Sequence, residues 1–153
     1  MSELYDLYQE ILLDHYKRPR NFGPLAASDG DAEGHNPLCG DRVEVHVKLA
    51  GDRLDEVRFE GSGCAISTAS ASMMTEAVRG KSRAEAAALY ERFHDLVTGA
   101  APGAESDESL GELAALAGVR EFPMRVKCAT LAWHTLRAAL EGDTPRVSTE
   151  SPG

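Results

Sequence analysis

The chain has 153 residues, and its 25 acidic against 16 basic residues give it a formal net charge of −9 at pH 7. This length suits one domain with its own hydrophobic core. The acidic balance argues against a protein that binds nucleic acid or anionic membranes, because neutralising phosphates requires clustered lysine and arginine, and no apolar run reaches the ~20 residues needed to cross a bilayer.

The first 60 residues predict a helix, a loop and a two-stranded hairpin. Five apolar residues at helical spacing form the stripe of the helix, and these are Leu4, Leu7, Tyr8, Ile11 and Leu12. Residues 19–38 are rich in Gly, Pro, Asn and Asp and are typical of a loop. Strict alternation of apolar and polar residues over 43–49 predicts a strand with one wet face. A second strand over 54–60, with a phase slip near Asp55, completes an antiparallel hairpin.

The chain after Cys64 is predicted to be helical. One helix begins there and ends near Gly80. Ser82 and Glu85 then form the capping box of the next helix, because a serine and a glutamate three residues apart can satisfy each other's backbone N–H groups. Residues 99–108 are expected to form a flexible acidic loop.

The last third of the chain predicts two more helices and a tail. The first is short and is closed by Gly118, and Pro123 suits the first turn of the second. We expect a single domain over residues 1–142, followed by a flexible C-terminal tail over 143–153. Strands early and helices late predict an α+β fold, with a small antiparallel sheet of about three strands and helices packed on one face.

Cysteines are the most informative residues of the chain. There are three, so they cannot all pair as disulfides, and we find no secretory signal at the N-terminus. Both features indicate a reducing cytoplasm, where thiols more often bind metal or catalyse. Cys39 and Cys64 adjoin glycines in predicted loops, and Cys128 lies near the start of the last helix. The alternative is three unrelated thiols that serve as small buried side chains.

A carboxylate near Cys39 suggests how these thiols act together. Asp41 follows Cys39 by two residues, and in an extended segment such residues point to the same side. Three thiolates and this carboxylate make a complete tetrahedral set for zinc or iron. The set carries excess negative charge, which Arg125 and Lys127 can partly offset. Among the histidines, His35 is the best spare ligand.

The other polar residues suggest no second chemistry. His46 falls on the polar face of its strand and is expected to be solvated, and His15 is expected to have a local role at a helix end. The hydroxyl-rich stretch 67–72 contains no nucleophile elbow, and no histidine has an evident claim as a base for its serines. We interpret this stretch as a surface for close helix packing, and the sequence therefore gives little support to a hydrolase function.

Four ordered motifs surround these residues: ILLDHYKRPRN at 11–21, NPLCGD at 36–41, GSGCAIS at 61–67 and RVKCA at 125–129. With them the chain resembles the NifU/IscU/SufU family of iron–sulfur cluster assembly proteins, over about residues 4–141. The resemblance implies that Cys39, Asp41, Cys64 and Cys128 bind metal together at one tip of the domain.

Two departures point to the SufU branch of that family. Scaffold-type members carry a histidine directly before the last cysteine, where this chain has Lys127, and residues 99–118 resemble an insertion. The resemblance implies a zinc-dependent sulfurtransferase, which accepts persulfide sulfur from a SufS-type cysteine desulfurase and passes it to a downstream iron–sulfur scaffold. We predict that Cys39 is the sulfur acceptor, because its glycine-flanked loop moves most easily. Arg125 is predicted to stabilise the negative charge of the site or to orient Asp41.

Two rival functions use the same ligands. In the first, the protein is itself a scaffold that holds iron or a transient [2Fe–2S] cluster. In the second, it is a non-enzymatic module in which zinc only shapes an interaction surface. Nothing in the sequence requires an oligomer, so we expect a monomer or a weak oligomer.

Overall fold

The structure, a computed structural model, describes residues 2–100, 108–142 and 146–148. Its elements, in chain order, are α1 (Ser2–Lys17), β1 (Gly30–Asn36), β2 (Asp41–Ala50), β3 (Arg53–Ser62), α2 (Ala65–Val78), α3 (Arg83–Thr98), the 3₁₀ segment η2 (Glu108–Glu121), α4 (Pro123–Glu141) and β4 (Arg146–Ser148). No described helix is both long and apolar enough to span a membrane.

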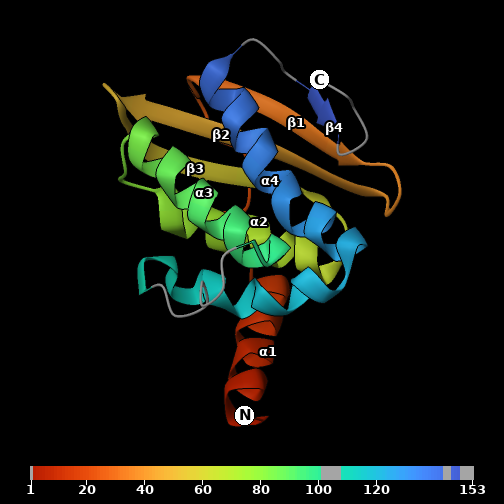
Figure 1. Cartoon of the computed structure of the whole chain (residues 1–153). Helices are drawn as coiled ribbons and strands as arrows, with labels where there is room; N and C mark the ends of the chain where they lie inside the picture. The colour runs from red at the N-terminus through yellow and green to blue at the C-terminus, as the bar shows by residue number, and fades with distance from the viewer. Residues whose placement is uncertain (1, 101–107, 143–145, 149–153) are drawn as a thin grey trace.

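The sheet confirms the predicted α+β fold. Its strand order is β3-β2-β1-β4. Strand β2 pairs antiparallel with both β1 and β3, and β4 pairs parallel with β1. Along β2 the inward-facing Val43, Val45 and Val47 are buried and the residues between them are not. Helices α3 and α4 lie on one side of the sheet (Figure 1). One face of the sheet therefore carries the core and the other meets solvent, as the alternation predicts.

The predicted phase slip in the second strand is a β-bulge. Lys48 of β2 pairs with Glu56, whereas the next residue, Leu49, pairs with Leu54. Asp55 is thus an extra residue on β3. Because of it, Leu54 before the bulge and Val57 after it both point into the core.

Strand β1 corrects the prediction that residues 19–38 form a loop throughout. The run Gly30–Asn36 pairs with β2 along its whole length, although it contains none of the branched residues typical of strands. Its glycines have a packing reason: a Cβ on Gly34 would overlap Thr135 Oγ1, and one on Gly30 would overlap a backbone carbonyl of α4. Helix α4 therefore crosses β1 closely because the strand lacks side chains there.

The predicted starts of α3 and α4 agree with the structure, but the predicted end of the short helix does not. Ser82 and Glu85 form the predicted capping box of α3, and Pro123 occupies the first turn of α4. The prediction that Gly118 closes the short helix is wrong, because η2 continues to Glu121. Gly111, with φ 53° and ψ −129°, interrupts η2 instead.

Two expected flexible regions fall largely outside the described residues. The acidic loop expected at 99–108 corresponds mostly to residues 101–107, which the structure does not describe. Within the expected tail 143–153, the structure differs at Arg146–Ser148, which form β4 on the edge of β1. Backbone pairing stabilises this strand even where the side chains give no core signal. The division into a domain and a tail stays a prediction.

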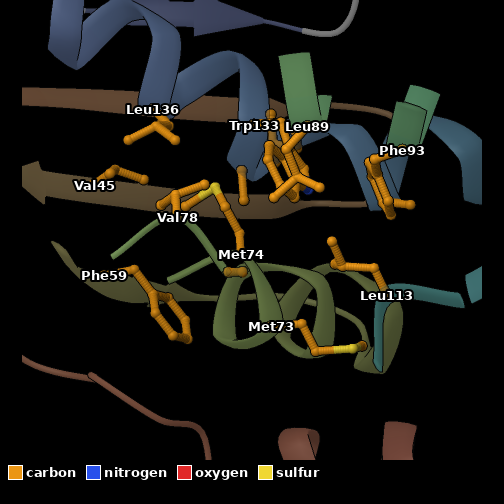
Figure 2. Packing of buried hydrophobic residues seen from close by; sticks show 14 of the residues in the cluster. Val45, Phe59, Met73, Met74, Val78, Leu89, Phe93, Leu113, Trp133 and Leu136 are labelled. Carbon is orange, nitrogen blue, oxygen red and sulfur yellow. The ribbon is translucent and has the colours of Figure 1, made fainter. Parts of the chain in front are cut away.

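A continuous apolar core joins the sheet to the helices (Figure 2). Val45 and Phe59 of the sheet and Met74 of α2 belong to this core, and Phe93 of α3 stacks on Trp133 of α4 with ring centroids 5.0 Å apart. Helix α1 extends away from this core (Figure 1). Of its predicted apolar stripe, Ile11 and Leu12 pack against the core, whereas Leu7 is half exposed because it lies on the projecting part of the helix.

The close crossing of α4 and β1 can be tested by mutation. We predict that Gly34→Ala lowers the free energy of unfolding by about 1–3 kcal/mol, because the new methyl group collides with Thr135 and forces the helix off the strand. Gly118→Ala is the matched control, since a Cβ there meets nothing within 4 Å. Urea unfolding measures both, and equal losses in the two variants would contradict the prediction.

Candidate metal centre

Three separate segments bring the four predicted ligands together. Cys39 lies in the turn between β1 and β2, and Asp41 is the first residue of β2. Cys64 follows β3 and is the N-cap of α2, where its sulfur accepts the Ser67 N–H at 3.4 Å. Cys128 lies in the second turn of α4. Strand ends and a helix N-terminus thus meet at one end of the sheet.

The spacing of the ligand atoms suits a tetrahedral metal ion. The sulfurs of Cys39 and Cys128 are 3.7 Å apart, and the Cys64 sulfur is 3.8 Å from Asp41 Oδ2. One ligand atom each from Cys39, Asp41 and Cys128 lies within 4.8 Å of the others. Zn–S bonds of about 2.3 Å in a tetrahedron put neighbouring sulfurs about 3.8 Å apart. Cys39, Asp41 and Cys128 can therefore hold a metal ion, with Cys64 beside them.

Asp41 supplies the strongest evidence that a cation belongs here. Its side chain is fully buried, and Oδ1 accepts the backbone N–H of Cys64 at 2.8 Å. A Cβ on Gly63 would lie 2.6 Å from the same oxygen, so glycine is needed for this approach. Among the residues that the structure describes, no lysine, arginine or histidine forms an ion pair with Asp41. A buried carboxylate without a positive partner is costly, and a bound metal ion removes that cost.

The three thiols differ in accessibility. Cys39 is exposed, Cys64 is intermediate and Cys128 is buried. Burial raises the pKa of the Cys128 thiol above its ordinary value, and hydrogen bonding with Asp41 raises this pKa further. Metal binding must therefore displace a proton from Cys128, whereas Cys39 remains open to reagents and partners.

Two predicted contributors to the site, Arg125 and His35, are exposed at the surface. Arg125 is exposed and, within the described part of the chain, forms no ion pair with Asp41, so its electrostatic role stays a prediction. His35 is exposed on the solvent face of β1, opposite Arg42 in the register. The interpretation of His35 as a spare ligand is wrong, because strand alternation turns its neighbour Asn36 toward the site instead. Asn36 was missed because β1 was interpreted as a loop.

His46 is also less solvated than predicted. Its side chain is 13% exposed, and its Nδ1 and Nε2 lie 2.6 Å from Asp31 and 3.0 Å from Glu60. These carboxylates come from the strands on either side of β2, so sequence alternation alone could place His46 on the wet face but not between them.

His15 lies in the last turn of α1, as expected, and its side chain also links three elements. It is buried, with Nδ1 at 2.7 Å from Ser72 Oγ and Nε2 at 2.9 Å from Glu112. The order Ser72–His15–Glu112 resembles a hydrolase triad, and sequence analysis found no base for a serine. Ser72 is fully buried, however, and its hydroxyl accepts the backbone N–H of Arg20. The network therefore fastens α1 to α2 and η2.

Comparison with known proteins identifies the fold and its motifs. Residues 7–141 match the model of the NifU-like N-terminal domain family. The chain belongs to this family. The resemblance inferred from the four motifs is thus confirmed, and three of these motifs contain the residues of the candidate metal centre, Cys39, Asp41, Cys64 and Cys128.

Relatives in the family carry two kinds of name. The chain is 45% identical to the iron–sulfur cluster assembly scaffold protein IscU of Streptococcus pyogenes, over 92% of this chain and 87% of that protein. It is 46% identical to the zinc-dependent sulfurtransferase SufU of Bacillus subtilis, over 88% of this chain and 90% of that protein. A crystal structure described as a SUF-system scaffold protein from Fervidobacterium islandicum superposes with a TM-score of 0.80 at 34% identity, covering 89% of this chain and 98% of that one.

Differences in burial predict an order of reactivity for the metal-free thiols. With a chelator present, iodoacetamide should alkylate Cys39 fastest and Cys128 slowest, because Cys128 is buried and its raised pKa keeps it protonated at neutral pH. Peptide mass spectrometry over time measures each site, and urea-unfolded protein, where the three rates converge, is the control. Labelling of Cys128 as fast as Cys39 in the folded protein would contradict this geometry.

Proposed function

We propose that the protein is a zinc-dependent sulfurtransferase of iron–sulfur cluster assembly. It accepts persulfide sulfur from a SufS-type cysteine desulfurase and passes it to a downstream iron–sulfur scaffold. The observation that carries the proposal is the buried Asp41 carboxylate, which lies among three thiols and forms no ion pair with a lysine, arginine or histidine of the described residues. The name of the Bacillus subtilis relative supports the choice of activity.

Zinc suits the donors that the chain offers. Cys39, Asp41, Cys64 and Cys128 would hold the ion, which when bound keeps thiols deprotonated at neutral pH and protects them from oxidation. Three sulfurs and one oxygen suit an ion of borderline softness. The backbone N–H of Cys64 orients the carboxylate, and the Ser67 N–H orients the Cys64 sulfur.

Cys39 is the ligand best suited to accept sulfur. Cys128 is buried, and Cys64 is held at the N-terminus of α2 by the Ser67 N–H, so neither can move far toward a partner. Cys39 is exposed in a turn, and Gly40 beside it has φ 73° with open space around it. Such a turn lets one thiolate leave the site while the other three groups remain in place.

The transfer step needs no external oxidant or reductant. The Cys39 thiolate attacks the terminal sulfur of the desulfurase persulfide and forms a new S–S bond. The old S–S bond breaks, and the desulfurase cysteine leaves as a thiolate. Cys39 then carries the persulfide, which the downstream scaffold receives by the same exchange.

Exposed apolar residues near the thiols suit the docking of a desulfurase. Leu38 adjoins Cys39 and is 54% exposed. Phe122 and Met124, at the start of the helix that carries Cys128, are 61% and 46% exposed. Large apolar side chains at a polar rim are typical of a surface that a partner covers. Arg125, which is exposed in the same turn, would steer the anionic persulfide toward Cys39.

The second candidate is a scaffold that holds iron or a transient [2Fe–2S] cluster on the same ligands. The Streptococcus pyogenes relative, named as such a scaffold, favours it, and thiolates suit iron as well as zinc. Lys127, in place of the histidine of scaffold-type members, favours the sulfurtransferase. The purely structural zinc module is disfavoured because the Cys39 sulfur is open to solvent.

Turnover of the desulfurase distinguishes these candidates. We predict that, with a thiol such as dithiothreitol present to reduce the persulfide to sulfide, the zinc-loaded protein strongly accelerates sulfide release by a SufS-type desulfurase, and that Cys39→Ala reduces the rate to that of the desulfurase alone. His35→Ala is the matched control, because His35 lies near Cys39 in the chain but on the solvent face of β1, and it should activate fully. Full activation by Cys39→Ala would exclude it as acceptor, and inhibition by the wild type would favour the scaffold.

A further inference from the structure

We infer that Asn36 is a positioning residue of the metal centre, because its one side chain holds both the buried Cys128 sulfur and the turn that carries Cys39. The inference rests on the proposed zinc site and deepens it. Asn36 is the last residue of β1 and is fully buried. It lies directly opposite Asp41 in the register of β1 and β2, and so beside the ligands rather than among them.

The first contact joins Asn36 to a ligand atom. Its Nδ2 group donates a hydrogen bond to the Cys128 sulfur at 3.6 Å. A thiolate accepts such a bond more strongly than a thiol does, because hydrogen bonding to a charged form favours that form. Asn36 therefore fixes the position of the Cys128 sulfur and the direction from which this sulfur can bind a metal ion.

The second contact joins Asn36 to the acceptor turn. Its Oδ1 accepts the backbone N–H of Leu38 at 3.2 Å, which closes an Asx turn. Its backbone carbonyl accepts the N–H of Cys39 at 3.3 Å. These bonds hold the turn where the Cys39 sulfur is 3.7 Å from that of Cys128. Asn36 thus couples the exposed ligand to the buried one.

The chemistry requires an amide at this position. The two contacts need one donor and one acceptor on the same short side chain, and asparagine supplies both without charge. An aspartate could still accept from Leu38, but it could not donate to sulfur and would add a negative charge beside Asp41 and the thiolates. A leucine has a similar size and would remove both hydrogen bonds.

Zinc and cobalt binding by the full chain test the role through two variants. We expect Asn36→Asp and Asn36→Leu to weaken zinc affinity about 10- to 100-fold in competition with a chromophoric chelator. At saturating Co²⁺, the sulfur-to-cobalt charge-transfer band should shift in both variants, which a loss of stability alone would not cause. His35→Ala is the control, because His35 is the neighbour of Asn36 but lies on the solvent face of β1. This variant should match the wild type.

A measurement on the wild type avoids any folding defect of the variants. On zinc addition, the proton resonance of the Asn36 side-chain amide should move downfield, because its acceptor becomes a metal-bound thiolate. A stationary resonance, or unchanged zinc affinity and cobalt spectra in both variants, would overturn the inference while leaving the zinc site intact. Failure of the wild type to bind zinc would overturn the proposed function, and the inference with it.

Discussion

The constraint on which this molecule depends is a buried carboxylate that forms no ion pair with a basic side chain in the described part of the chain. Asp41 opens the central strand β2, is fully buried, and accepts the backbone N–H of Cys64. Burying a charged carboxylate costs free energy, which hydrogen bonds and a nearby cation offset. Three thiols converge on it, so one tetrahedral ion would satisfy the carboxylate and the sulfurs together. The surrounding structure holds these donors close in spite of their mutual repulsion.

The fold achieves this convergence through backbone contacts that leave no room for side chains. Gly34 and Gly30 let α4 cross β1 closely, which fixes the height of Cys128 above the sheet. Gly63 lets Asp41 approach the N-terminus of α2. The core beneath, in which Phe93 stacks on Trp133, keeps the helices rigid (Figure 2). Three of the donors are thus held by regular structure, and the fourth, Cys39, is exposed in a turn. A site that releases one ligand to a partner needs the other ligands to stay fixed, and this arrangement provides that.

Elements that depend on a local sequence pattern could be predicted from the sequence, whereas contacts between distant residues could not. Strand β2, the capping box at Ser82 and the turn of Pro123 depend on local patterns, and the sequence predicts them well. Strand β1 has no such pattern, because its glycines are needed where α4 packs closely on it. Interpreting this strand as a loop hid the role of Asn36 and led to the wrong position for His35. The surroundings of His15 and His46 depend on residues 14 to 97 positions away, which no local pattern contains. The candidate ligands were suggested by the count of cysteines and by the position of Asp41 two residues after Cys39, and the motif resemblance then implied the same set, since their wide spacing alone is weak evidence.

The ligand set itself is the central claim, and X-ray absorption at the zinc edge measures it directly. We predict a four-coordinate ion in the zinc-loaded protein, with three sulfur scatterers at about 2.3 Å and one oxygen at about 2.0 Å. Replacement of Cys39 by alanine should remove one sulfur and leave the other three donors in place. A spectrum dominated by imidazole nitrogen, or one with fewer than three sulfurs in the wild type, would contradict the account.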